Sequence, residues 1–490
     1  MEVQELLKLY AAHPQVTALD TLLKNDTSRN IFLKGLNGSG PAMTIASLFT
    51  KGRGSYVCVL NDQEEAGYFY HDLMQLTASN EVYFFPSAYR RAIKYGHVDP
   101  ANEILRTEVL SRLQDPDASF VIVTYPDALA ERVVAREVLK ENTLKISVGE
   151  KLDNMFVSDV LDEYGFEQVD YVYEPGQYAL RGSILDVFSF SNEFPYRIDF
   201  FGDEVETIRT FDVETQLSKE KLDSIYIVPE MSKNAKDSTS LLGSLPRNTF
   251  IAARDLAWCK ERIGSVWNDD PVVADEESFA DIDQMRKKLV RGEDFLREVL
   301  DFRRIHFGVR PMGTADATIH FSTQTQPIYH KNFDRVSESF HKYLDEGYAL
   351  YILSDQEKQA NRIRMIFEDR GDNIPFPAVN RTIHEGFADD TLRICFFTDH
   401  QLFDRFHKFN LKSDKARSGK ITLSLKELNQ FSQGDYIVHI DHGVGQFGGL
   451  VRTEVNGKMQ EAIKLIYQNN DIIFVSIHSL HKLSKYKGKE

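Results

Sequence analysis

The first part of the chain alternates short apolar runs with longer segments whose apolar residues recur at helical spacing. The apolar runs include IFLKGL, YVCVLND, VYFFPS and SFVIVTYP, and the segments between them include QEEAGYFYHDLMQL and NEILRTEVLSRL. Short strands separated by amphipathic helices are typical of a parallel, doubly wound α/β sheet. We therefore predict that residues 1–139 form the first part of an α/β domain.

Residues 140–225 change to a β-rich pattern, with YVYEPGQYALRGSILDVFSF followed by PYRIDFFGDEVETIRTFD. The second stretch alternates apolar and polar residues on both sides of Gly202-Asp203, which predicts a β-hairpin. Residues 151–210 contain thirteen acidic and four basic residues, so this surface disfavours phosphate. We predict an α+β domain inserted into the α/β domain.

The rest of the chain divides by pattern into three further segments. Residues 226–334 return to a mixed α/β pattern and are interpreted as the second part of the first domain. Residues 335–425 contain the apolar runs YALYILSD and LRICFFTD on either side of a helical stretch, which predicts a small α/β domain. Residues 430–490 have short alternating strands and predict a small β-barrel.

Length and composition narrow the function classes. A chain of 490 residues is expected to form several domains. Its net charge of −16 argues against general binding of nucleic acid, so another protein is the default partner. Three distant cysteines make neither a disulfide framework nor a metal pair, so a reducing cytoplasm is expected. No apolar run is long enough to predict a membrane span.

The stretch IFLKGLNGSGPAMTIASLF has the order of a phosphate-binding loop: a strand, a glycine-rich turn and a helix. Gly35 and Gly40 occupy the two glycine positions of that motif, with Gly38 between them. Pro41 and Ala42 occupy the places of the lysine that grips phosphate and the hydroxyl that holds magnesium. We therefore predict a degenerate nucleotide loop without ATP hydrolysis, retained for its tight backbone geometry. Weak anion binding by its amides is the alternative.

Other polar clusters have plain structural interpretations. His439 and His442 flank Asp441 in HIDHG, but an odd separation on a strand places two side chains on opposite faces. Polar packing at a turn is therefore favoured over a metal site. The basic runs at 403–420 and 478–490 are interpreted as solvated linker, with phosphate contact as the alternative.

The strand EAIKLIYQ places Ile463 and Leu465 on one face and Lys464 on the other. If this strand lies at a sheet edge, it offers free backbone groups to a strand of a partner protein. If it lies inside the sheet, it is an ordinary core strand. The pattern alone leaves both alternatives open.

The string EPGQYALRGSILDVFSFSNEFPYRIDFFGDEVETIRTFD, from Glu174 to Asp212, resembles the excision-repair protein UvrB and, more closely, the UvrB-like half of the bacterial transcription-repair coupling factors (the Mfd family). The segment GDYIVHIDHGVGQFGGL is similar to the RNA-polymerase-interaction domain of that family, which is shared with CarD-type regulators. The order of the two signatures points to the coupling factors. The resemblance implies a UvrB-like helicase-type fold that has lost its ATPase.

In that family the chain continues into a motor, so we expect the N-terminal part of a protein about twice as long. The motor would bind ATP, magnesium and double-stranded DNA, leaving no cofactor in the residues here. This part would bind the RNA polymerase β subunit and recruit UvrA. The resemblance marks candidate UvrA-binding residues, which are Arg181, Gln168, Arg197 and Phe188, and candidate polymerase-binding residues, which are Ile463, Lys464 and Leu465.

Two other classes remain as alternatives. A UvrB-type ATP-dependent repair enzyme would need the missing phosphate-binding lysine. It would also need a long aromatic hairpin, where this chain has only the short stretch YFFPSAYRRAIKYGHVDPANEILRTEV. A stand-alone CarD-like regulator would not contain the UvrB-like segments.

Overall fold

The computed structural model describes residues 2–25, 27–88, 99–213, 215–231, 238–268, 286–405, 407, 409, 411, 431–439, 441–455, 458–468, 471–476 and 483–486. The chain forms two compact units. The first contains Met1–Ser87, Val109–Val133 and Ser238–Leu411, and the second contains Ala88–Glu108, Val134–Asp237 and Lys412–Glu490. Among the helices of the described part, none has the length and apolar character needed to cross a bilayer.

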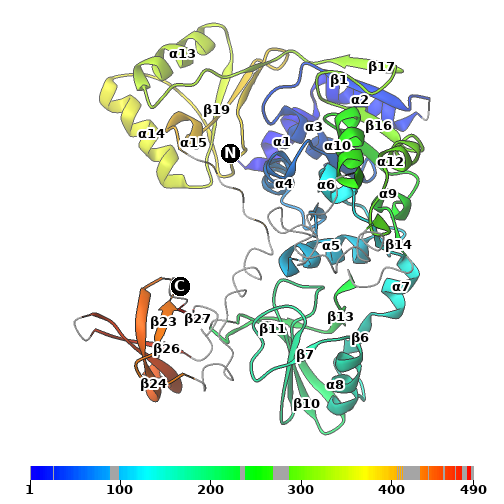
Figure 1. Ribbon diagram of the computed structural model, residues 1–490. Coiled ribbons are helices and arrows are strands. Elements are labelled where there is room, and N and C mark those ends of the chain that lie inside the picture. Colours follow the sequence, from blue (N-terminus) through cyan, green and yellow to red (C-terminus); the bar gives the residue numbers. More distant parts are fainter. Residues whose placement is uncertain are drawn as a thin grey trace. The chain divides into compact units, whose positions relative to one another are not determined.

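The first unit is built on a seven-stranded sheet in the order β17-β1-β16-β15-β2-β4-β3, and every pairing in it is parallel. Figure 1 labels three of its strands, β1, β16 and β17. The strands from the first segment are β1 (Asn30–Lys34), β2 (Tyr56–Val59), β3 (Val82–Phe85) and β4 (Val121–Thr124). The later strands are β15 (Phe250–Ala253), β16 (Arg303–His306) and β17 (Ala317–His320), and β15 and β16 lie between β1 and β2. The predicted parallel α/β sheet is therefore present, and chain on both sides of the inserted segment completes it.

Helices pack on this sheet through the apolar faces that the sequence predicts. α3 (Gly40–Thr50) packs against α1 (Val3–Ala11), α2 (Pro14–Lys24) and α4 (Gln63–Thr77), while α10 (Leu256–Asn268) packs against α6 (Pro126–Leu129) and α12 (Gly292–Val299). The short α9 (Leu241–Ser244) contacts α12. α3 is buried along almost its whole length, which explains its apolar sequence GPAMTIASLFT.

A second, five-stranded sheet of the first unit has the order β18-β21-β22-β19-β20. Its strands are β18 (Thr323–Thr325), β19 (Ala349–Leu353), β20 (Ala378–Val379), β21 (Phe387–Asp389) and β22 (Ile394–Thr398). Helices α13 (Phe333–Asp345), α14 (Glu357–Arg370) and α15 (Asp399–Leu402) belong to the same part of the chain. Its core includes Phe340, Ile352, Phe367 and Phe397.

The second unit contains a six-stranded sheet in the order β12-β11-β10-β9-β8-β7. The strands are β7 (Glu167–Gln168), β8 (Gln177–Arg181), β9 (Ile184–Val187), β10 (Tyr196–Phe201), β11 (Glu204–Phe211) and β12 (Ser218–Leu222). β10 and β11 are antiparallel and meet at Gly202-Asp203, so the predicted hairpin is confirmed. One face of this sheet packs against α8 (Asn154–Glu163) and the two-stranded ribbon of β6 (Leu144–Ser147) and β13 (Ser224–Ile227).

Four further elements lie near the points in the sequence where the chain passes from one unit to the other. They are α5 (Pro100–Arg112), β5 (Val133–Val134), α7 (Arg136–Glu141) of the second unit and β14 (Ser238–Thr239) of the first unit. The first half of α5 belongs to the second unit and contributes Ala101 and Ile104 to a small apolar cluster with β8 and β9.

The C-terminal strands, orange to red in Figure 1, form an antiparallel sheet in the order β26-β25-β24-β23-β27. They are β23 (Tyr436–His439), β24 (Gly443–Val455), β25 (Lys458–Ile466), β26 (Ile472–Ser476) and β27 (Leu483–Lys485). The predicted barrel is not confirmed, because no pairing among the described residues joins β26 to β27. The mixed α/β architecture with several sheets is confirmed.

Candidate functional site

The glycine-rich turn joins β1 to α3, as the sequence predicts. Gly35 and Gly38 have φ values of +90° and +53°, a region that favours glycine. A Cβ atom on Gly35 would lie 2.2 Å from the carbonyl oxygen of Phe321, and one on Gly38 would lie 2.9 Å from that of Glu385. The close approach of other protein segments therefore accounts for these two glycines without a ligand. Pro41 lies in the first turn of α3, where a missing N–H is tolerated.

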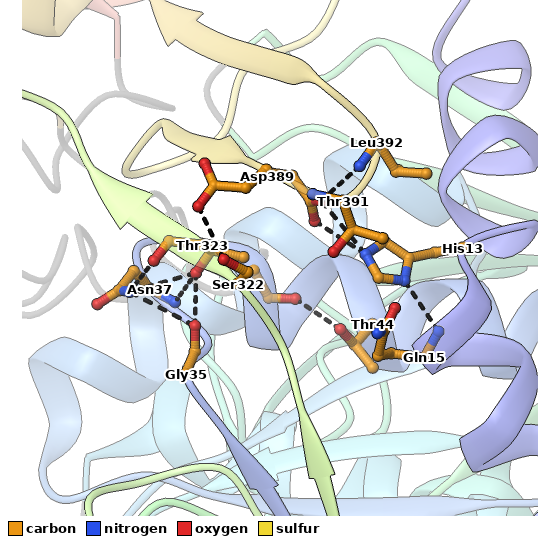
Figure 2. A network of polar contacts seen from close by, with 12 residues as sticks. His13, Gln15, Gly35, Asn37, Thr44, Ser322, Thr323, Asp389, Thr391 and Leu392 are labelled. Atoms are coloured by element: carbon orange, nitrogen blue, oxygen red, sulfur yellow. Dashed lines mark hydrogen bonds and ion pairs between the residues drawn. The ribbon is translucent and has the colours of Figure 1, made fainter.

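Backbone N–H groups of the glycine-rich turn that could bind a phosphate already donate hydrogen bonds within the protein. Figure 2 shows the N–H of Asn37 directed at Thr323, whose Oγ1 accepts it at 2.9 Å and in turn donates to the Gly35 carbonyl at 2.7 Å. The N–H of Ser39 donates to the Glu385 carbonyl at 2.9 Å, and the Glu385 N–H donates to the Ser39 hydroxyl at 3.0 Å. An anion would have to displace these bonds.

The same part of the molecule is held by a buried histidine and carboxylate. His13 Nδ1 accepts the N–H of Gln15 at 3.0 Å, so its Nε2 carries the proton that is donated to Asp389 at 3.1 Å (Figure 2). Asp389 also accepts the N–H groups of Thr391 and Leu392. These contacts tie the N-terminal helices to the five-stranded sheet that covers the turn.

A cavity of about 320 Å³ adjoins the turn and has an acidic lining. Arg254 contributes a positive charge, whereas five carboxylates line the cavity: Asp62, Glu64, Glu65, Asp72 and Glu385. Burial raises the pKa of Asp72 to about 7, while hydrogen bonds from the Ser39 hydroxyl and the His384 N–H act in the opposite direction. This lining repels phosphate, which is the reverse of what a nucleotide site requires.

No sequence pattern indicated the histidine cluster beside this cavity, because its histidines are irregularly spaced and their ring partner Tyr68 lies more than 300 residues earlier in the chain. The His384 ring stacks on Tyr68 at 3.6 Å between centroids, and the His400 and His407 rings stack at 4.2 Å. Burial lowers the pKa of all three histidines to about 4, so they are neutral at physiological pH. Within the described residues no group of three or more His, Cys, Asp or Glu side chains could hold a metal ion.

The histidines of the HIDHG segment serve a turn. His439 Nδ1 accepts the N–H groups of Asp441 and His442, at 3.1 and 3.3 Å. This agrees with the predicted polar packing at a turn. The expectation that the two side chains lie on opposite faces is wrong, because β23 ends at His439 and the chain turns there, which brings the two rings to 4.6 Å between centroids. Most of the basic runs 403–420 and 478–490 lies outside the described residues.

Arg181 and Arg197, two of the candidate UvrA-binding residues, converge on one buried carboxylate. Arg197 binds Asp186 through Nε at 2.6 Å and through a terminal nitrogen at 2.8 Å, and Arg181 binds the same carboxylate. Arg181 also donates to the Asp170 carbonyl at 3.0 Å and lies over the Tyr171 ring. About a third of the Arg181 side chain, 34%, stays exposed, so this arginine is pre-oriented and still accessible. The contact with Asp186 was not predicted from the sequence; a carboxylate inside the apolar strand SILDV is the signal that could have indicated it.

The other two candidates do not join this cluster. Phe188 is buried, packed with Ala101 and Ile104 of α5. Gln168 is exposed on β7 and lies in register with Tyr178 of β8. Gln168 therefore shares the face of the sheet that carries the Tyr178 ring and the core, which is the face opposite to Arg181. Arg181 and Arg197 are thus the pair whose geometry fits a shared surface.

The candidate polymerase-binding strand is internal. β25 pairs with β24 on one side and β26 on the other, so the edge-strand alternative is wrong. Ile463 and Leu465 are fully buried in the core of this sheet and cannot reach a partner in this fold. Lys464 is half-buried on the opposite face, in register with Phe474 of the terminal strand β26. Phe474 and Ile472 are each 46% exposed.

Comparison with known proteins finds two domain families, one over the arginine pair and one over the C-terminal sheet. The family model of the UvrB interaction domain matches residues 144–232, which contain the arginine pair. The family model of the CarD-like/TRCF RID domain matches residues 431–487, which contain the C-terminal sheet. The chain therefore combines a UvrB-type interaction domain with a CarD-like domain, in the order that the sequence signatures predict.

The similarity extends over nearly the whole chain to proteins named transcription-repair-coupling factor. The Escherichia coli K12 protein is 22% identical over 92% of this chain and 45% of its own length. Two Staphylococcus aureus proteins, from strains RF122 and MRSA252, are 22% and 23% identical over 97% of this chain and 47% of their own lengths. The predicted resemblance to the coupling factors is confirmed, and the chain spans about half the length of these relatives.

Proposed function

We propose that this chain is the recruitment half of a transcription-repair coupling factor, which binds the RNA polymerase β subunit and recruits UvrA to lesions in transcription-coupled excision repair. The observation that supports this most directly is the pairing of two domain families, UvrB interaction and CarD-like/TRCF RID, in one chain. Similarity to coupling factors over more than nine tenths of the chain agrees with it.

For UvrA, we propose a contact centred on Arg181 and supported by Arg197. Asp186 fixes both guanidinium groups, which reduces the entropy lost when a partner carboxylate binds the planar fork. Arg181→Ala leaves Asp186 paired with Arg197, so the fold should persist while affinity falls. Arg209→Ala is the matched control, because Arg209 also pairs with a carboxylate of this sheet, Asp199.

For polymerase, we propose a contact on the Lys464 face of the C-terminal sheet, extending to the terminal strand β26. Exposed Ile472 and Phe474 offer apolar contact there. Among the described strands of this sheet β26 is the outermost, a position that suits pairing with a strand of a partner protein. The test is binding to the N-terminal region of the β subunit by wild type, Phe474→Arg and Lys464→Glu. Unchanged binding by both variants would reject this face. Leu465→Arg is unsuitable, because it places a charge in the core.

We further propose that the first unit is a scaffold with a decayed nucleotide loop, and that ATP, magnesium and double-stranded DNA translocation belong to motor domains outside this chain. Pro41, the bonded amides and the acidic cavity support this interpretation. The alternative, a UvrB-type ATP-dependent enzyme, predicts a rise in melting temperature with Mg-ATP. The scaffold proposal predicts no shift, and a saturable shift would refute it.

A further inference from the structure

The seven-stranded sheet has a second cavity, of about 560 Å³, at the edge opposite the glycine turn. Arg29 precedes β1, Phe250 begins β15 and Arg303 begins β16, and all three residues line this cavity. Because these strands are parallel, their first residues lie together at the amino ends of the strands, whereas the glycine turn lies at the carboxyl ends. The residues of this cavity lie outside both matched domain families.

The lining of this cavity is strongly basic. One carboxylate, Asp301, faces five cations: Lys24, Arg29, Arg53, Arg247 and Arg303. Asp20 lies behind them and pairs with Lys24 at 3.3 Å and with Arg53. Even with Asp20 counted, five cations face two carboxylates, in a chain whose net charge is −16. We name this feature the basic pocket.

Fixed contacts hold these cations in place. Arg303 donates to the carbonyl oxygens of Leu22, Leu23, Asn25 and Ser28 at 2.9–3.2 Å, which caps the end of α2 and accounts for one of the five. Arg29 donates to the Asp301 carbonyl at 2.6 Å, and Arg247 pairs with the Asp301 carboxylate at 2.9 Å. A site whose charges are already oriented loses little freedom on binding.

The basic pocket is open to a large ligand. Arg247 is 76% exposed and Lys24 is 51% exposed, so both can reach a ligand on the rim. Gly52 also lines the pocket, and its missing side chain leaves open space there. Several separated cations around an open hollow match adjacent phosphates of an extended backbone better than one enclosed phosphate group.

We propose that the basic pocket binds the phosphate backbone of nucleic acid, independently of the UvrA and polymerase contacts. A protein with a net negative charge can still bind phosphate at a basic pocket, because salt screens exposed charges that lie more than about 8–10 Å away at physiological ionic strength. The nearby cations then outweigh the distant carboxylates. Phosphate contacts of this kind position a protein without reading sequence. A nucleotide-binding parallel sheet binds phosphate at the carboxyl ends of its strands. In this sheet the carboxyl ends, at the glycine turn, are acidic and the amino ends, at the basic pocket, are basic, so the charges favour phosphate at the amino ends.

The test uses the whole chain and fluorescence anisotropy with a labelled duplex DNA, over a series of salt concentrations from about 50 mM. The variant is Lys24→Glu with Arg247→Glu, and Lys24→Gln with Arg247→Gln avoids placing a carboxylate beside Asp20. The matched control is Lys342→Glu with Arg297→Glu. Lys342 also lies in the last turn of a helix in an i,i+4 ion pair, and Arg297 is 78% exposed and ion-paired as Arg247 is.

We expect both pocket variants to bind duplex DNA on the order of tenfold more weakly, with a salt dependence reduced by about two phosphate contacts. The control should bind as wild type does. Equal weakening by pocket and control variants would attribute binding to overall charge and overturn the proposal. No binding by wild type at low salt would also overturn it. A parallel experiment measures the melting temperature with tripolyphosphate. If tripolyphosphate raised the melting temperature of the wild type but not of the pocket variants, and the variants bound DNA as the wild type does, the pocket would be a site for a small polyanion and the nucleic-acid proposal would be rejected.

Discussion

Replacing His400 by glutamine should reduce the acid sensitivity of the first unit. His400 is buried, stacks on His407 and donates through Nε2 to the His384 carbonyl at 2.8 Å. A glutamine amide can donate to the same carbonyl but does not titrate. Burial is the main cause that lowers the His400 pKa to about 4, partly offset by that carbonyl.

The sign follows from proton linkage. Because the folded-state pKa is depressed, this histidine stays neutral in the folded protein while the unfolded chain takes up a proton below about pH 6.5. Its stability contribution is therefore complete above pH 6.5 and is lost as pH falls toward 4. At pH 5.5, one unit below the unfolded pKa, the loss is on the order of 1 kcal/mol, because one pKa unit corresponds to about 1.4 kcal/mol.

The assay is urea unfolding followed by tryptophan fluorescence at pH 7.5 and 5.5. Both tryptophans of the chain, Trp258 and Trp267, lie on α10, so the signal reports the first unit. Asp72 also titrates nearby, with the opposite sign, but it is present in both proteins and cancels in the comparison. The wild type should lose about 1 kcal/mol more than His400→Gln between the two pH values. Equal losses, or the same reduction in His320→Gln at an exposed histidine, would refute the reasoning.

Three further predictions concern backbone strain, core burial and a buried acid. Gly38→Ala should destabilise the first unit by about 1–3 kcal/mol, because its Cβ would meet two carbonyl oxygens at 2.9 Å. Gly52→Ala, with φ of +71° but open space, should cost only about 1 kcal/mol in the same urea assay. Leu465→Arg should unfold the C-terminal sheet, seen as rapid proteolysis between residues 431 and 487, whereas exposed Phe474→Arg should stay resistant. Asp72→Asn should remove a stability loss of about 1 kcal/mol per pH unit as pH rises from about 4 to about 7, because the unfolded carboxyl ionises in that range while the folded one keeps its proton. An unchanged pH profile would contradict this.

Local features of the chain were predictable because they depend on neighbouring residues. Apolar runs and helical periodicity indicated the parallel α/β sheet, and the Gly202-Asp203 pair indicated the hairpin. Alternation along EAIKLIYQ correctly separated buried Ile463 and Leu465 from Lys464. The substitution of Pro41 and Ala42 for a lysine and a hydroxyl residue was visible directly.

The position of each strand in its sheet was not readable from the chain. β25 is internal because β26 pairs along its other side. β15 and β16 enter between β1 and β2, although they follow β2 by about 190 residues or more in the chain. Burial of Phe188 likewise depends on α5, which precedes it by about 80 residues. The sequence resemblance named candidate residues, but their exposure depended on these contacts.

By itself, the sequence determined the secondary-structure classes, the loss of the phosphate-gripping residues and the resemblance to coupling factors. Only the tertiary structure decided which charges converge: two arginines on Asp186, three neutral histidines near Tyr68, and five cations around one cavity. The physical reason is that side-chain periodicity arises from local backbone geometry, whereas strand pairing and charge clustering arise from long-range packing of segments that no local pattern connects.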